Sequence, residues 1–351
     1  VARPPPSGAA AEIIMQPYRL FQVLLSLTLL AAPGARAGRP ADHALPLQAA
    51  YALLAKGDYA SAYPAFLRHA ENNPLAQFTL AQFHQNGWGR PADPDAACAW
   101  FGKAAQGKIP TALHFAGDCL MRTPDAPGNA AAALSSYLAA AANGHLISLC
   151  SASEFYVRGR YVARDVPHGL ALCAQAAQAG SPPAMLKLAN YLRNDRDVPH
   201  DAAMARHWYR MAAERQVDEA RYQLAIMQAQ GEGGEAEGEA ALLALEELAS
   251  KGYVPAYLPT ATLYAHLPPD ADTGAPGAAN LAKTYLWASA ARSRLSDPAL
   301  QDQARQLQDQ VLAIMPPEWR PALDRKIDAH LAQFAAPGTP LKRASHVSPG
   351  A

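Results

Sequence analysis

The chain has no excess of charge of either sign. Its 351 residues include 30 lysines and arginines and 30 aspartates and glutamates, and charged residues make up only 17% of the total. A nucleic-acid-binding protein needs a basic surface to neutralise phosphates, so this balance argues against nucleic acid as a partner. Aromatic residues are few, at 8%, but half of the chain is hydrophobic, which excludes a disordered polypeptide. Because alanine, the strongest helix former, is abundant, the composition predicts an all-α protein.

Recognisable catalytic and metal-binding motifs are also absent from the sequence. The patterns G-x-S-x-G, S-x-x-K, H-E-x-x-H, G-x-G-x-x-G and G-x-x-x-x-G-K-[ST] do not occur. The 11 histidines are scattered. His200 and His207 could share a helix face, but no carboxylate–histidine cluster converges on them to complete a metal site. We therefore expect no enzyme activity, no cofactor and no metal ion.

One long apolar run lies near the N-terminus, where Leu20 to Ala32 follows Arg19. The run is shorter than the roughly 20 apolar residues that a membrane-spanning helix needs. An A-x-A triplet follows at residues 35–37. A basic residue, a short apolar core and such a triplet are the parts of a secretory signal peptide. Residues 1–37 are therefore interpreted as a signal peptide that is cleaved near Ala37.

The signal peptide predicts where the mature protein works. Met15 is the natural translation start, so residues 1–14 are interpreted as an upstream mis-start. After processing we expect no transmembrane segment. The expected location is the periplasm or the exterior of a bacterium, where disulfides persist.

A 36-residue period organises the chain from residue 75 onward. Two positions of the period, those of Ala76 and Ala81, hold only alanine, glycine or serine. Small residues at fixed positions let helices approach closely, so each period is predicted to be a hairpin of a helix A and a helix B. The recurring residues are Ala112, Ser148, Ala184, Ala220 and Ala256 at the first position, and Gly117, Ser153, Ala189, Ala225 and Ala261 at the second.

Each predicted hairpin has a loop rich in glycine and proline between its helices, as at residues 87–91. Asp93, Asn129 and Asp201 share one phase just before helix B. They are expected to be N-caps, because their side chains accept hydrogen bonds from helix-start amides. In the third period the loop looks about four residues longer, which predicts a helix B one turn shorter.

The pattern resembles the Sel1-like repeat family, which is related to the tetratricopeptide repeats. The residues that carry the resemblance are the small and apolar positions of 76–81, the block Trp100-Phe101-x2-Ala104-Ala105, and the block 208–213, Trp-Tyr-Arg-Met-Ala-Ala. The resemblance covers about residues 75–292. It implies a right-handed α-solenoid in which helix A of every unit lines the concave side.

The remaining segments complete the predicted organisation. Residues 38–46 are a linker, 47–74 a divergent N-terminal helix pair, and 75–293 the Sel1-like repeats. Residues 294–334 are interpreted as C-terminal capping helices, and 335–351 as a disordered tail rich in proline, glycine and serine. In such an array each unit is stabilised by its neighbours rather than by itself.

The four cysteines leave two interpretations open. An even number in an exported chain suggests two disulfides, for which sequence allows three connectivities. The local pairs, Cys98–Cys119 and Cys150–Cys173, close loops on the order of 20 residues, each worth roughly 3 kcal/mol. The alternative is that the cysteines are buried thiols, since Cys119 and Cys173 occupy positions that are aromatic in the first period.

By analogy with tetratricopeptide proteins, the positions of Phe78, Gln82 and Asn86 should face the concave groove. An apolar row flanked by amides, carboxylates and arginines suits a peptide or protein segment. Alternatively, the Phe78 position packs between neighbouring A helices. Cys150 shares that position, and if it faced the groove it would be unlikely to bridge to Cys173. The candidate groove residues are Phe78, Gln82, His114, Asp118, Glu154, Arg158, Leu186, Asn190 and Tyr222.

The resemblance implies a scaffold for protein–protein interaction, and the predicted signal peptide implies that it is exported and has a protein or peptide partner in the cell envelope. An alternative is an accessory role in exopolysaccharide assembly or export, or in other envelope machinery, where such scaffolds also occur. Exposed aromatic rows in the groove would favour a glycan, whereas alternating charge would favour a protein. A third hypothesis is a β-lactamase-like hydrolase, but the S-x-x-K signature of its serine nucleophile is missing.

Overall fold

A computed structural model describes residues 43–271 and 273–334, and all of its regular elements in these ranges are helical. The predicted signal peptide and the predicted C-terminal tail lie outside the described residues. Of the predicted linker, only the part from residue 43 is described, and it ends in a short 3-10 helix, η2 (Leu45–Leu47).

The helices follow one another as antiparallel hairpins, and helices adjacent in sequence pack together. An N-terminal pair is followed by five regular units, a sixth unit and two further helices. The pair is α2 (Gln48–Ala55) and α3 (Tyr59–Leu67). Units one to five are α4 (Pro74–Asn86) with α5 (Pro94–Gln106), α6 (Pro110–Leu120) with α7 (Asn129–Ala142), α8 (Ser148–Arg158) with α9 (Val166–Gln178), α10 (Pro182–Asn194) with α11 (Ala202–Glu214), and α12 (Asp218–Gln230) with α13 (Gly238–Ser250). The remaining elements are η3 (Val254–Ala256), α14 (Tyr257–Ala265), α15 (Ala278–Arg294), α16 (Pro298–Leu312), η4 (Pro317–Trp319) and α17 (Arg320–Gln333).

The stride of 36 residues holds through the third unit, contrary to the expectation of a longer loop there. The loop at 159–165 has the same length as those at 87–93 and 195–201, and α9 has the same 13 residues as α5 and α11. The reason is local. Gly159 ends α8 in the left-handed conformation, as Gly87 ends α4, so the chain leaves both helices in the same way.

Aspartates cap three of the B helices, two of them, at Asp93 and Asp201, as predicted. The side chains of Asp93, Asp165 and Asp201 accept hydrogen bonds from amides in the first turns of α5, α9 and α11. The expectation for Asn129 is wrong. Gly128 is the N-cap of α7, and Asn129 is already its first residue, with a side-chain amide that donates to the Thr123 carbonyl at 2.9 Å.

The repeated small residues lie where helices approach most closely, which confirms their predicted role. Ala76, Ala184 and their equivalents in the other units are completely buried. Gly117 illustrates such an approach: a Cβ atom there would lie 2.7 Å from the ring of Tyr137 on the partner helix α7. Any larger residue at that point would push the two helices of unit two apart.

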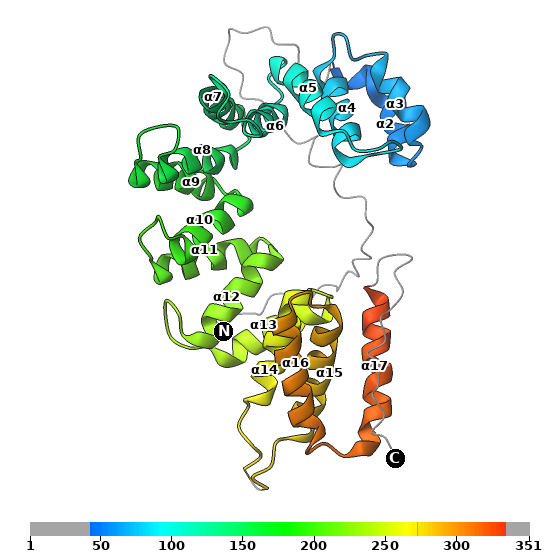
Figure 1. The fold of residues 1–351 in the computed structure, drawn as a ribbon, viewed down its shortest axis with the longest axis vertical. Helices are drawn as coiled ribbons and strands as arrows, with labels where there is room; N and C mark the ends of the chain where they lie inside the picture. Colours follow the sequence, from blue (N-terminus) through cyan, green and yellow to red (C-terminus); the bar gives the residue numbers. More distant parts are fainter. Residues whose placement is uncertain (1–42, 272, 335–351) are drawn as a thin grey trace, which may run out of the picture.

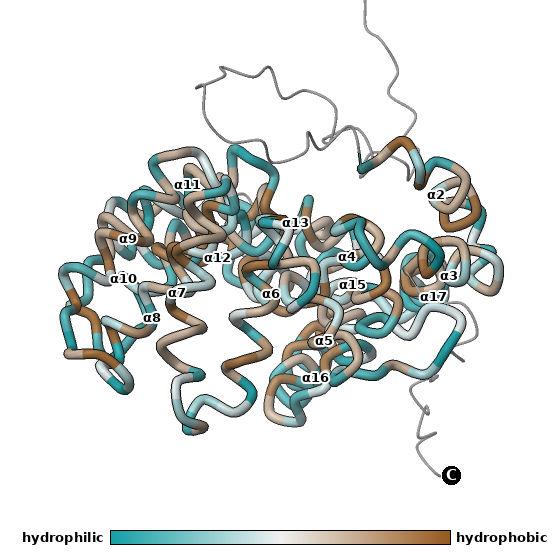
Figure 2. Tube along the Cα trace, turned by 90° about the horizontal axis from the view of Figure 1, so that it is seen from above, coloured by the Kyte–Doolittle hydropathy of each residue, from teal (hydrophilic) through white to brown (hydrophobic). Residues whose placement is uncertain are grey.

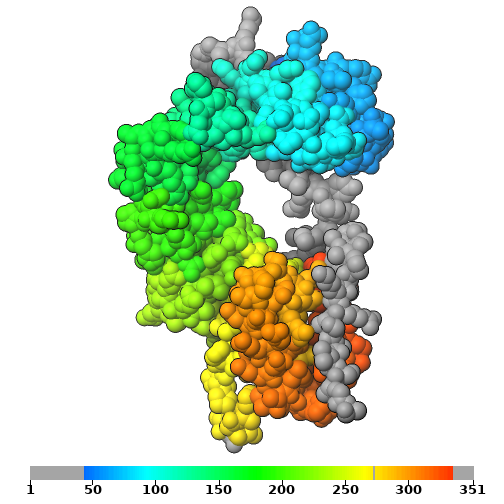
Figure 3. All heavy atoms as spheres, in the orientation of Figure 1, coloured from blue at the N-terminus to red at the C-terminus, as the bar shows by residue number. Residues whose placement is uncertain are grey.

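The hairpins stack into an α-solenoid that curves around an open centre (Figure 1). In that view α6 lies toward the inner side of the arc and α7 toward the outer side. The space-filling view shows the same arc with a hollow between its two arms (Figure 3). At the C-terminal end, α15, α16 and α17 pack with α14 and share one hydrophobic core with α13.

Apolar and polar residues alternate along the chain in Figure 2, which views the arc from above and colours it by hydropathy.

Among the helices of residues 43–271 and 273–334, none combines the length and the apolar character that crossing a bilayer requires.

Candidate interaction surface

The apolar positions predicted to face the groove pack instead between helices. Phe78 is half-buried, with its ring centroid 5.8 Å from that of Phe101 on the partner helix. Tyr222 lies 5.7 Å from Tyr253, and Leu186 packs against the core of units three and four. Phe78 thus contacts helix B of its own unit rather than a neighbouring A helix, and all three side chains stay partly exposed.

Two polar groove positions are held by tyrosines of helix B. The Tyr137 hydroxyl donates to Asp118 at 2.7 Å, and the Tyr209 hydroxyl donates to Asn190 at 2.6 Å. The two pairs occupy equivalent positions in units two and four. Burial is the main cause that raises the pKa of both tyrosines. Both hydroxyls therefore stay protonated and act as donors. Gln82, the equivalent residue in unit one, is half-buried.

The structure brings Glu154 and Arg158 together on α8, and Glu154 also connects unit three to unit four. Arg158 Nε donates to Glu154 Oε1 at 2.9 Å, while the Tyr191 hydroxyl donates to the other carboxylate oxygen. Lys187 Nζ lies 3.5 Å from that same oxygen. Burial alone would raise the pKa of Glu154, but Tyr191, Lys187 and Arg158 together lower it. The carboxylate is therefore ionised at neutral pH and is shared by α8 and α10.

Arg158 extends this network to the loop of unit four. Its Nη1 donates to Asp195 at 2.7 Å and to Asp197 at 2.6 Å. The guanidinium is the main cause that lowers the pKa of Asp195. Together with Asn194 and Arg196, these three side chains line an open polar hollow of about 590 Å³. We call the side chains of Glu154, Arg158, Lys187, Tyr191, Asp195 and Asp197 the inter-unit charge network.

The same arrangement recurs one unit further along. Arg193 on α10 donates to Glu232, in the loop of unit five, at 2.7 Å, and to Gln223 on α12 at 2.7 Å. Sequence reasoning missed these partners because it considered positions within one helix. A signal was present nonetheless: Arg158 precedes Asp195 by 37 residues and Arg193 precedes Glu232 by 39, close to one period in each case.

His114 lies in a different environment, at the junction of units two and three. Its Nδ1 is 2.9 Å from the Ser148 hydroxyl, and its Nε2 is 3.5 Å from Asp118. The order Asp–His–Ser resembles a hydrolase triad, but a nucleophilic serine must reach a substrate carbonyl. Ser148 is completely buried and also contacts His145 at 2.7 Å, so its hydroxyl is enclosed by two imidazoles.

The cysteines form the two local disulfides. Cys98–Cys119 connects α5 of unit one to α6 of unit two, with a Cα–Cα distance of 5.6 Å. Cys150–Cys173 connects α8 to α9 within unit three, with a Cα–Cα distance of 4.2 Å. Cys150 is only 2% exposed, so it packs in the core and does not face the groove. Within the described ranges, no group of three or more histidines, cysteines or carboxylates could hold a metal ion.

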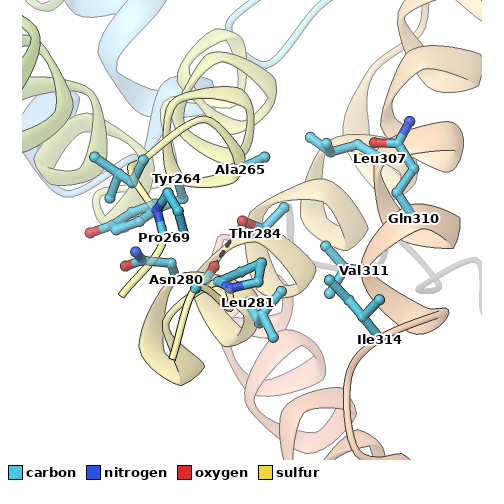
Figure 4. A pocket seen from close by; sticks show the side chains of 13 residues that line it. Tyr264, Ala265, Pro269, Asn280, Leu281, Thr284, Leu307, Gln310, Val311 and Ile314 are labelled. Atoms are coloured by element: carbon cyan, nitrogen blue, oxygen red, sulfur yellow. Dashed lines mark hydrogen bonds between the residues drawn. The ribbon is translucent and has the colours of Figure 1, made fainter. Parts of the chain in front are cut away.

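A separate hollow of about 350 Å³ lies in the C-terminal block, between the end of α14, the start of α15 and α16 (Figure 4). Leu281, Val311 and Ile314 make much of its wall apolar, and Asn280 and Gln310 add amide groups. The three helices follow one another in the chain, and only their packing encloses this hollow.

The fold and the surface define an α-solenoid of repeated helical hairpins. Comparison with protein families identifies the repeat: the Sel1 repeat family model matches residues 74–108, 148–181, 182–217 and 218–252. The chain therefore contains four Sel1 repeats, within the region of residues 75–293 where the sequence pattern predicted such repeats. Unit two, which lies between the first and second matches, is not matched.

Solved structures support the same fold. A Sel1 repeat protein from Oxalobacter formigenes is 22% identical, with a TM-score of 0.56 over 70% of this chain and 98% of that one. The protein c5321 of uropathogenic Escherichia coli, described as a protective antigen with an SLR fold, is 18% identical, with a TM-score of 0.55 over 85% of this chain and 65% of that one. The comparison with curated proteins found no match.

Proposed function

We propose that this protein is a scaffold that binds a protein segment on the inner surface of its arc, at the inter-unit charge network. The observation that carries the proposal is that these charges are both held in place and accessible. The side chains of Glu154, Arg158 and Lys187 are 38%, 34% and 45% exposed, although each one bonds across helices or units. Charged groups that are already ordered lose little conformational entropy when a partner binds.

The chemistry of this surface favours a protein over a glycan. Carboxylates and cations alternate between α8, α10 and the loop of unit four, which gives a partner of matching charge both specificity and register. The aromatic rings of Tyr191 and Tyr209 are buried and offer no exposed face for a sugar to stack on. A protein segment that carries charges of both signs fits this surface best.

We further propose that the protein works outside the cytoplasm, with a partner in the cell envelope. The predicted signal peptide supports this location. The two disulfides are consistent with it, because such bonds persist in oxidising compartments.

The test is an affinity capture with the mature protein as bait and a bacterial envelope extract as the source of partners. Lys187→Glu reverses a charge within the network, and Arg210→Glu makes the same change on the exposed surface of α11. We expect Lys187→Glu to lower recovery of the partner by about tenfold, which corresponds to 1.4 kcal/mol, and Arg210→Glu to match the wild type. Equal recovery with both variants would place the binding site elsewhere.

A further inference from the structure

Two histidines share one buried serine hydroxyl where unit two meets unit three. His145 Nδ1, from the turn before α8, lies 2.7 Å from Ser148 Oγ, and His114 Nδ1, from α6, lies 2.9 Å from the same oxygen. The two imidazole centroids are 4.7 Å apart. Ser148 is completely buried, and the His114 side chain is only 15% exposed. Neither unit can move relative to the other without disturbing this contact.

The hydroxyl has one proton, which dictates the direction of the hydrogen bonds. Asp118 lies beside Nε2 of His114, so that nitrogen carries the imidazole proton and Nδ1 accepts from Ser148. Ser148 Oγ must then accept from Nδ1–H of His145. The result is a chain from His145 through Ser148 and His114 to Asp118. Tyr137 completes it by donating to Asp118 at 2.7 Å.

This chain satisfies its members only while His114 is neutral, because a proton on Nε2 of His145 leaves its Nδ1–H donating to Ser148. A proton on His114 Nδ1 would point at the serine oxygen and displace the hydroxyl proton from its acceptor. A second proton would place two positive charges about 5 Å apart in a largely buried site. The titratable groups that face the pair are Asp118 from α6 and Tyr137 from α7, whereas α8 contributes the uncharged Ser148 hydroxyl.

We propose that the junction between units two and three is a pH-sensitive hinge, which is closed while His114 and His145 are neutral and loosens when they take up protons. On α6 only Ala112 and Gly117 are buried, and the apolar contact between the two units is made by α7 and α8, where the ring centroids of Tyr137 and Phe155 lie 6.2 Å apart. The hinge would change the angle of units one and two relative to the rest of the arc. It does not depend on what the arc binds.

The burial of the two imidazoles determines whether a lower pH opens or closes the hinge. Burial is the main cause that lowers the pKa of both His114 and His145 below the ordinary value of 6.5, and Asp118 opposes it only in part. The neutral pair therefore contributes fully to the stability of the closed junction above about pH 6.5, and this contribution is lost as the pH falls toward the folded-state pKa values. Acidification opens the hinge, and neutral pH closes it.

The experiment is hydrogen–deuterium exchange on the full-length mature protein at pH 7.5 and 5.5, corrected for intrinsic exchange rates. We expect protection of amides in residues 143–158 to fall about tenfold at the lower pH, the change that one pKa unit produces, while residues 182–194 keep theirs. The double variant His114→Gln/His145→Gln has no titrating imidazole and should lose this difference. The control His207→Gln, at an exposed site on α11, should behave as the wild type.

Equal loss of protection in wild type and double variant, or no loss in the wild type, would overturn the proposal. If the double variant does not fold, proton NMR of the wild-type histidine rings decides the question instead. Titration midpoints of His114 and His145 below 6.5 would support the hinge, and midpoints at or above that value would contradict it.

Discussion

Unit two and unit four adopt the same hairpin by different means. In unit four, α10 completely buries a set of apolar side chains that includes Met185, Leu188 and Tyr191. In unit two, α6 buries only Ala112 and Gly117. The Sel1 family model matches unit four and does not match unit two. The comparison shows that a repeat can lose the apolar pattern that identifies it in sequence and still keep its geometry.

Specific bonds join unit two to its neighbours on both sides, in addition to the apolar contacts of α7 with α8. On one side the Cys98–Cys119 disulfide joins it to unit one. On the other side Ser148 and the two histidines join it to unit three. Apolar packing tolerates changes of redox state and pH, whereas a disulfide and neutral imidazoles do not. The arc is therefore most sensitive to its environment around unit two.

The largest expected effect tests the dependence of unit four on packing. Leu188→Ala should lower the free energy of unfolding by about 4 kcal/mol, because it leaves a cavity in a core where Leu188 is 3% exposed. Unit two already has alanine at the equivalent position, Ala116. Urea denaturation followed by circular dichroism measures the change. A loss below about 1 kcal/mol would mean that unit four does not depend on this core.

The next effect concerns the disulfide beside unit two. Cys98→Ala/Cys119→Ala should lower the free energy of unfolding by roughly 3 kcal/mol, since the bond closes a loop with a sequence separation of 21. Hydrogen exchange should show the loss mainly in α6 and α7, with α10 and α11 little changed. If protection from hydrogen exchange fell equally in all units, this would contradict a local role for the disulfide.

A matched pair of variants compares the same hydrogen bond in the two units. Tyr137→Phe removes a bond to the carboxylate of Asp118, and Tyr209→Phe removes a bond to the amide of Asn190. We expect Tyr137→Phe to lower the free energy of unfolding by about 1.5 kcal/mol and Tyr209→Phe to lower it by about 1 kcal/mol, because hydrogen bonds to charged acceptors are stronger. Thermal unfolding of both variants in one buffer gives the comparison. A larger loss for Tyr209→Phe than for Tyr137→Phe would show that the charge of Asp118 does not strengthen the hydrogen bond.

The smallest effect belongs to the inter-unit charge network. Asp195→Asn should cost less than about 1 kcal/mol, because the Arg158 side chain that pairs with it is partly exposed to solvent. Arg158 lowers the pKa of Asp195, so this contribution is present above the ordinary value of 3.8 and is lost as the pH falls through the folded-state value. The free energies of unfolding of wild type and variant, measured by denaturation at pH 7 and pH 3, should therefore be closer to each other at pH 3 than at pH 7.

Local features of the repeat were predictable from sequence because each depends on neighbours within one hairpin. Alanine and glycine at the positions of Ala76 and Ala81 mark close helix contacts, and aspartates such as Asp93 mark helix starts. The longer loop expected in unit three was wrong, because Asp165 lies at the same phase as Asp93 and Asp201 and caps α9 there. Local periodicity was a better guide there than the apparent loop length.

The candidate surface was only partly predictable. Glu154 and Arg158 are four residues apart on one helix face, so sequence could place them together. Their partners Tyr191, Asp195 and Asp197 come from the next unit, and only the stacking of units brings them within reach.

The sequence by itself determined that this chain folds as repeated helical hairpins, because turn chemistry, capping and small-residue spacing act within about 36 residues. It also limited the disulfides to a few pairings, of which the structure contains the two local ones. Tertiary structure decided which side of each A helix is open. The rotation of one hairpin against the next leaves Phe78 half-buried and Lys187 exposed, and that rotation is the sum of many contacts between units.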